Sequence, residues 1–124
     1  ANGKPVANRV QPGKRPRSSM SPTFVLDRDD RVVAALGSAG GSRIIGDVLQ
    51  ALLGMLDWNL SAEAALAQPR LINRKGTTEL ERDTPRAKQA DALRGLGHEV
   101  QVRRHEGGLA AIRRSTAAWC CDQA

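Results

Sequence analysis

Two short segments in the first third of the chain carry residue types that can bind an anion. Ser18 and Ser19 lie in a proline-bounded loop, and their hydroxyls can donate hydrogen bonds to a carboxylate. Gly40 and Gly41 lie in the run Gly-Ser-Ala-Gly-Gly-Ser, where glycine can adopt positive φ and leave its N–H uncovered. Because a helix is expected to begin directly after them, unpaired amides and the helix dipole favour negative charge there. An oxyanion hole has these requirements.

Each segment also has a simpler interpretation. Loop serines are more often turn or capping residues, and a glycine run alone is more typical of a tight strand-to-helix turn. Arg43, which follows the glycines, can pair with an anion or form a structural ion pair. The glycine spacing fits neither a Walker phosphate loop nor a dinucleotide fingerprint, and the chain has no Gly-x-Ser-x-Gly elbow.

The remaining titratable residues indicate no further chemistry. His98 and His105 have no partners at metal-ligand spacing, so we expect both at the surface or at strand ends. Glu79, Glu81 and Asp83 alternate along the chain, which favours a solvated strand edge over an acid–base pair. We therefore expect neither a metal site nor a cofactor.

The composition limits the class of protein. With 124 residues the chain forms one domain or part of one, and no apolar stretch is long enough to span a membrane. The net charge is +6, but basic residues gather in the N-terminal loop and aromatic residues are only 2%, so nucleic-acid binding is not favoured. Two adjacent cysteines, Cys120 and Cys121, define no redox compartment. The absence of Met at Ala1 indicates a processed product or a fragment.

The elements that must position the candidate residues follow from periodicity and turn signals. Residues 1–22 should be irregular, and residues 23–26 and 31–36 should form a hairpin, with the apolar run 32–36 buried on both faces. Ser42 should cap a helix that ends near Leu56. Its expected apolar stripe comprises Ile44, Ile45, Val48, Leu49, Leu52, Leu53 and Leu56.

The second half of the chain is expected to form shorter elements. Ser61 should cap a short helix, and Thr84 a third helix with Pro85 at its first position, ending near Leu96. Short strands are expected at residues 71–73, 79–81, 100–102 and 109–112. Because strands come in consecutive pairs, the predicted class is α+β.

The motifs together resemble one family. They are Pro-Gly-Lys-Arg-Pro-x-Ser-Ser-Met-Ser-Pro-Thr, Gly-Ser-x-Gly-Gly-Ser-Arg-Ile-Ile, the following Val-Leu-Gln, and Ala-x-x-Gln-Pro-Arg. Over residues 10–102 the chain is similar to the C-terminal part of the small subunit of γ-glutamyltranspeptidases, which are N-terminal-nucleophile (Ntn) hydrolases. The resemblance implies a partial αββα sandwich. It divides the chain into a basic loop segment (1–22), a partial small-subunit domain (23–113) and a divergent tail (114–124).

The resemblance also implies roles for particular residues. Ser18 and Ser19 would bind the α-carboxylate of a γ-glutamyl group, and Gly40 and Gly41 would form the oxyanion hole. Met20 and Arg43 would support the two loops. The family nucleophile is a threonine upstream of these motifs, and no threonine of this chain stands in a matching context.

The resemblance therefore implies a fragment of a γ-glutamyltransferase or glutathione hydrolase, inactive alone, that acts on γ-glutamyl compounds such as glutathione. Its partner would be the large subunit or the upstream part of the same precursor, and its location periplasmic or secreted. Two alternatives stay open: a cephalosporin or glutaryl acylase of the same superfamily, and a non-catalytic truncated remnant. The tail lacks a Gly-Ala-x-Asp-Pro-Arg-like segment, which indicates truncation or a frameshift. We also expect an exposed sheet edge and apolar face.

Overall fold

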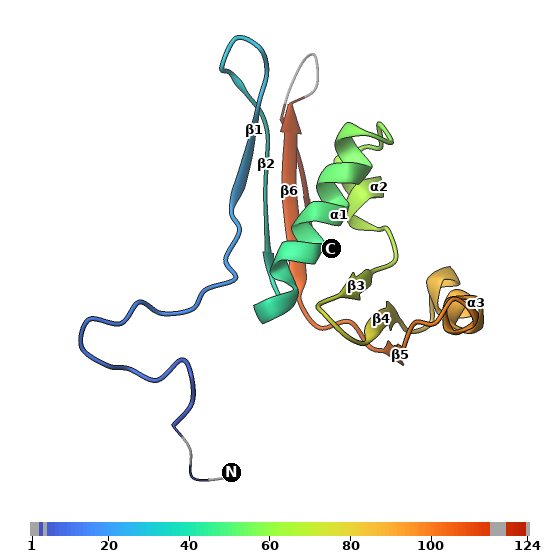
Figure 1. Ribbon diagram of the computed structural model, residues 1–124. Coiled ribbons are helices and arrows are strands. Elements are labelled where there is room, and N and C mark those ends of the chain that lie inside the picture. The colour runs from blue at the N-terminus through green and yellow to red at the C-terminus, as the bar shows by residue number, and fades with distance from the viewer. Residues whose placement is uncertain (1–2, 4, 115–118, 124) are drawn as a thin grey trace.

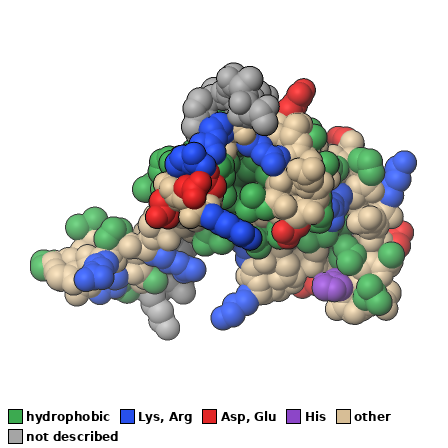
Figure 2. Space-filling model, turned by 90° about the horizontal axis from the view of Figure 1, so that it is seen from above, with side chains coloured by type: hydrophobic (Ala, Val, Ile, Leu, Met, Phe, Trp, Pro, Cys, Tyr) green, Lys and Arg blue, Asp and Glu red, His purple; other side chains and the backbone are tan. Residues whose placement is uncertain are grey.

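The N-terminal segment stands apart from the rest of the molecule. The computed structural model describes residue 3, residues 5–114 and the backbone of residues 119–123. Residues 5–22 form no helix or strand and extend from the body of the molecule (Figure 1), as predicted. Seen from above, this segment projects as an arm that carries basic side chains (Figure 2).

The larger sheet is antiparallel and has four strands in the order β1-β2-β6-β7. Its strands are β1 (Thr23–Leu26), β2 (Val32–Ala39), β6 (Gly108–Arg114) and β7 (Trp119–Gln123). Strand β1 is an edge strand, and its pairing with β2 confirms the predicted hairpin. The tail expected to diverge contributes β7, which pairs with β6.

Asp27 organises the turn of the β1–β2 hairpin. Its Oδ1 accepts hydrogen bonds from the N–H groups of Asp29 (2.9 Å) and Arg31 (3.0 Å). Arg114, on the neighbouring β6, donates from Nη2 to Asp27 Oδ2 at 3.0 Å. These donors, the Arg31 N–H first among them, lower the pKa of Asp27 from 3.8 to about 2.

A helical layer covers one face of this sheet. It comprises the 3-10 helix η1 (Gly41–Arg43), α1 (Ile44–Leu56) and α2 (Ala62–Leu66), with α1 lying along the sheet (Figure 1). Ser61 caps α2 as predicted, because its Oγ accepts the Ala64 N–H at 3.1 Å. The core between the layers comprises Leu36, Ile44, Val48, Ala51, Met55, Ala62, Ala65, Leu66, Leu109 and Ala111.

The burial of α1 and β2 differs from the sequence-based expectation. On β2, buried Ala34 and Leu36 alternate with half-buried Val33 and Ala35, so only one face of the strand is covered. Helix α1 is apolar both on the side that faces the sheet and on the side that faces away from it. The members of the expected stripe that are exposed are Ile45, Leu49, Leu53 and Leu56.

The uncovered face of the larger sheet is also apolar. Phe24 lies on it with 69% of its surface exposed, and the register places Ala35 and Ile112 on the same face. Because paired residues of antiparallel strands share a face, these side chains form a continuous strip across three strands. The exposed edge and apolar face predicted from the sequence are therefore present.

A smaller three-stranded sheet follows the helical layer, in the order β3-β4-β5. The parallel β4–β5 pair needs a crossover, which η2 and α3 provide. Pro85 opens η2 as predicted, but Thr84 does not cap it, because its hydroxyl donates to Glu81 O at 2.8 Å. The elements are β3 (Leu71–Asn73), β4 (Thr78–Glu81), η2 (Pro85–Gln89), α3 (Ala90–Gly95) and β5 (Val100–Arg103). The fold is α+β, as predicted.

Candidate functional site

The glycine turn is shorter than its sequence suggests. Strand β2 continues through Ala39, so the turn proper consists of Gly40 and η1. Gly41 has φ +59°, in the left-handed region that favours glycine. No described residue accepts a hydrogen bond from the Gly40 N–H, and helix geometry leaves the first N–H groups of η1 without partners. This turn therefore keeps the uncovered amides that an anion site needs.

Ser42 does not cap the long helix, and that prediction was wrong. It lies inside η1, while the N-cap of α1 is Arg43, which makes no capping bond through its side chain. The Ser42 hydroxyl instead accepts a hydrogen bond from Arg74. A 3-10 turn before α1 moved the cap by one residue, a frequent arrangement at helix N-termini.

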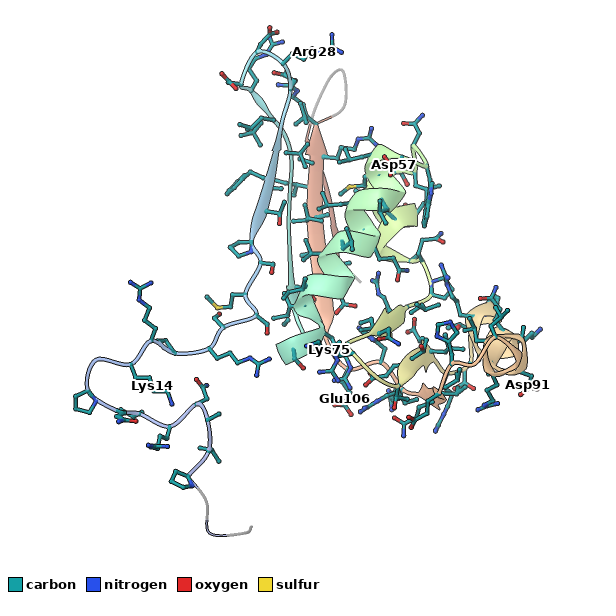
Figure 3. All side chains as sticks on the ribbon, in the orientation of Figure 1. Lys14, Arg28, Asp57, Lys75, Asp91 and Glu106 are labelled. Atoms are coloured by element: carbon teal, nitrogen blue, oxygen red, sulfur yellow. The ribbon has the colours of Figure 1, made fainter. Side chains whose placement is uncertain are left out.

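The strand register brings the two candidate segments to the same end of the larger sheet. Thr23 at the start of β1 pairs with Leu36 on β2. Ser19 lies four residues before Thr23, and Gly40 lies four residues after Leu36. The serine loop and the glycine turn therefore leave the sheet at the same end. In Figure 3, Glu106 and Lys75 mark this end, and Asp57 marks the opposite end of α1.

Within the serine loop, the two hydroxyls differ in environment. Ser18 is exposed and its Oγ accepts the Met20 N–H at 3.1 Å, whereas Ser19 is half-buried and its carbonyl accepts the Ser21 hydroxyl at 3.2 Å. The Met20 side chain is 77% exposed, so its contact within the loop is made by the backbone. These short-range bonds hold the loop in turns that leave the Ser19 hydroxyl free of described partners.

Arg43 is held by a two-pronged ion pair next to the glycine turn. Its Nε and Nη2 donate to the two Glu79 oxygens at 2.6 and 3.0 Å. Arg74 (3.2 Å) and Arg103 (3.7 Å) also approach Glu79. The bonds to Arg43 lower the pKa of Glu79, and those to Glu79 raise the pKa of Arg43. The cluster of three arginines around one carboxylate therefore carries more positive than negative charge.

The position of Glu79 corrects the expectation of a solvated strand edge. β4 is the central strand of the smaller sheet, and the Glu79 side chain is only 13% exposed. Alternation of glutamates predicted one polar face correctly, but the sequence did not reveal that arginines from three other segments cover it.

Asp47 and His105 were missed as neighbours of the site. Asp47 is 1% exposed within α1, and His105 Nε2 lies 3.5 Å from Asp47 Oδ1. His105 follows the end of β5, in agreement with the expectation of a surface or strand-end position, and its side chain is only 14% exposed. One signal was available: position 47 lies between Ile44 and Val48 on the buried side of a helix.

Three of the four threonines among the described residues, Thr23, Thr78 and Thr84, form local hydrogen bonds. Thr23 donates to Ser21 O at 3.1 Å, and Thr78 accepts from Asn73 Nδ2 at 2.8 Å. Thr116 lies outside the described residues. Across the described part of the chain, no three His, Cys, Asp or Glu side chains are grouped to bind a metal, and no helix has the length and apolarity of a membrane span.

Known proteins resemble this chain in sequence. Residues 1–123 match the family model described as gamma-glutamyltranspeptidase. The chain is 39% identical over 93 residues to the glutathione hydrolase proenzyme of Bacillus subtilis strain 168, covering 75% of this chain and 16% of that protein. It is 38% identical over 104 residues to the acylase ACY 1 proenzyme of Pseudomonas sp. strain SE83, covering 83% and 18%.

A solved structure extends the likeness to three dimensions. The gamma-glutamyltranspeptidase from Pseudomonas nitroreducens complexed with L-DON superimposes with a TM-score of 0.81 at 35% identity, covering 95% of this chain and 63% of that chain. The chain thus spans about a sixth of the length of the curated relatives quoted above. The α1–α2 layer on the larger sheet corresponds to part of an Ntn-hydrolase αββα sandwich. The chain belongs to the gamma-glutamyltranspeptidase family.

Proposed function

We propose that this chain supplies the carboxylate-binding and oxyanion-binding half of an active site that transfers or hydrolyses γ-glutamyl groups. Ser18 and Ser19 bind the substrate α-carboxylate, and the N–H groups of Gly40 and Gly41 stabilise the tetrahedral oxyanion. The observation that carries the proposal is the strand register, which sends both segments out at one end of the sheet. Arg43 and Met20 support the two loops.

The nucleophile comes from outside this chain. In acyl transfer its hydroxyl loses a proton to a base that also lies outside this chain and attacks the γ-carbonyl, whose oxygen becomes the oxyanion. Collapse then breaks the C–N bond, the base passes the proton to the departing amine, and an acyl–enzyme ester remains. Water or an acceptor amine then breaks that ester through a second oxyanion at the same site. In both the formation and the breakdown of the ester, the residues described here stabilise negative charge on the substrate, and none of them accepts a proton.

A partner completes the site and covers the apolar surfaces. The open face that carries Phe24, Ala35 and Ile112 is suited to packing against the large subunit or the upstream part of the same precursor. A glutathione-like γ-glutamyl amide is the proposed substrate, and a periplasmic or secreted location is proposed with it. Fractionation of cells that express the complete gene tests the location.

A chimera tests the activity. Residues 10–113 replace the matching segment of the Bacillus subtilis glutathione hydrolase, and release of aniline from a γ-glutamyl anilide is measured. We expect turnover by the chimera, and none by the 124-residue chain alone because it has no nucleophile. A folded chimera without turnover would contradict the proposal, as would turnover by the isolated chain that is abolished by substitution at Gly41.

An acylase is the second candidate, and the 38% identity to the acylase ACY 1 proenzyme favours it. A glutaryl amide carries the same distal carboxylate as a γ-glutamyl amide and lacks only the α-amino group. Ser18 and Ser19 are therefore compatible with either acyl group. Comparing kcat/KM of the complete protein for γ-glutamyl and glutaryl anilides separates the two activities, and a preference for the glutaryl compound would identify an acylase.

A further inference from the structure

A buried carboxylate lies directly behind the glycine turn. Asp47 is 1% exposed and sits among core residues of α1, where an unpaired charge is costly. Ser38 donates to its Oδ2 at 3.4 Å, a long hydrogen bond. His105 lies 3.5 Å from its Oδ1, near enough for attraction, yet no described residue donates a hydrogen bond to that oxygen. Asp47 is thus buried with less compensation than a structural carboxylate normally has.

The contacts of Asp47 enclose the turn on both sides. Ser38 and Asp47 flank it in the sequence, so their hydrogen bond closes a loop across Gly40. A Cβ built on Gly40 would lie 3.4 Å from Asp47 Oδ2. From the other side, the segment before β6 approaches, with His105 against Asp47 and Gly107 against the backbone of Ala39. Asp47 therefore connects three segments that determine where the turn lies.

The surroundings of Asp47 disfavour its charged form. Burial raises its pKa, and the opposing attractions of His105 and Arg70, the hydrogen bond from Ser38 and the attraction of Arg43 do not outweigh that effect. A raised carboxyl pKa in the folded state means that the fold is most stable with Asp47 protonated. That stability is lost as the pH rises through the folded-state value. A buried group with this property beside a binding loop is a candidate for a functional role.

We propose that Asp47 is a positioning residue of the oxyanion site. Its carboxylate, held between Ser38 and His105, keeps the Gly40–Gly41 turn in the conformation that directs the two N–H groups at the substrate oxygen. Arg43 and Arg70 attract this carboxylate and so partly offset its negative charge. The inference rests on the proposed function in one respect: the turn is taken as the oxyanion site.

The first test needs no substrate. The 124-residue chain is labelled with ¹⁵N-glycine, and the amide shifts of its 12 glycines are followed from pH 4 to 9 for the wild type, Asp47→Asn, Ser38→Ala and the control Asp57→Asn. Asp57 is exposed at the other end of α1. We expect the Gly40 and Gly41 amides to titrate in the wild type and the control, and to lose that titration in Asp47→Asn.

The melting temperature separates positioning from ordinary packing. We expect Asp47→Asn to raise Tm at neutral pH, because the amide keeps the size of the side chain without its charge. In the chimera the same variant should lower kcat by at least ~10-fold with little change in KM, because misplaced donors weaken transition-state binding alone.

Several results would overturn the inference. Unchanged Gly40 and Gly41 shifts in Asp47→Asn would do so, and so would a lower Tm in that variant. Glycine amides at random-coil positions in the wild type would also overturn it, because the described residues would then not build the turn. These readouts do not depend on turnover, so an inactive chimera would contradict the proposed function and leave this inference standing.

Discussion

Replacing Gly107 by alanine should shift the backbone that carries the glycine turn. Gly107 has φ +141°, and a Cβ at this position would lie 2.2 Å from the carbonyl oxygen of Ala39. Real Cβ contacts essentially never fall below 3.0 Å, so the two backbones must separate by about 0.8 Å. Ala39 is the last residue of β2, and Gly40 follows it. The strain therefore acts directly on the candidate oxyanion turn.

The expected loss of stability combines two effects. An unfavourable φ costs about 1–3 kcal/mol, and forcing apart packed backbone costs about 1–3 kcal/mol more. A total of about 2–6 kcal/mol is a large fraction of the ~5–15 kcal/mol typical of a domain, and at about 5 °C per kcal/mol it lowers Tm by roughly 10–30 °C. Thermal unfolding followed by circular dichroism, at low protein concentration, measures this shift.

Gly95→Ala is the matched control. Gly95 ends α3, has no positive φ, and has nothing within 4 Å of its would-be Cβ. Alanine there should raise stability by about 0.5–1 kcal/mol, because glycine is the poorer helix former. If Gly107→Ala melts within ~2 °C of the wild type, the two backbones do not approach each other as closely as described.

Three further predictions concern the hairpin, the arginine pair and the open face. Because the pKa of Asp27 is lowered to about 2, ionised Asp27 stabilises the fold above about pH 4, and this stabilisation is lost as the pH falls toward 2. Asp27→Asn should therefore flatten the decline of stability in acid unfolding. An unchanged profile would contradict the turn geometry. Arg43→Lys should cost about 1–2 kcal/mol in urea unfolding, because lysine cannot make the two-pronged bond of a mostly buried pair, whereas no loss would show the pair to be solvent-screened. Phe24→Ser should reduce binding of a hydrophobic dye and slow aggregation with little change in Tm, and a clear fall in Tm would place Phe24 in the core instead.

Local signals predicted most of the elements. The hairpin at Asp27, the Ser61 cap and the Pro85 start depend on neighbouring residues only, and the structure confirms each of them. Ser42 does not cap α1, because it lies inside the 3-10 turn η1 that precedes the first residue of the α-helix. Burial was harder to predict, because α1 is apolar on two sides and only packing decides which side meets the sheet.

For the candidate site too, the sequence predicts some residues, and only the tertiary structure reveals others. Serine and glycine types marked Ser18, Ser19, Gly40 and Gly41 from the sequence, since hydroxyls and uncovered amides are properties of the residues themselves. The neighbours Asp47 and His105 are 58 positions apart, and their meeting depends on the path of the segment before β6. No periodicity records such long-range contacts, so tertiary structure was needed to find them.

One kinetic comparison tests the central claim, that Ser18 and Ser19 bind the α-carboxylate of a γ-glutamyl group beside the glycine turn. The chimera is assayed with γ-glutamyl anilide and with 4-aminobutanoyl anilide, which lacks only that carboxylate. Hydrogen bonds to a charged group contribute ~1.5–3 kcal/mol each, so two of them predict a preference of about 10²-fold or more in kcat/KM. We predict that Ser18→Ala combined with Ser19→Ala reduces this preference to a few-fold. A double variant that keeps the full preference would contradict it.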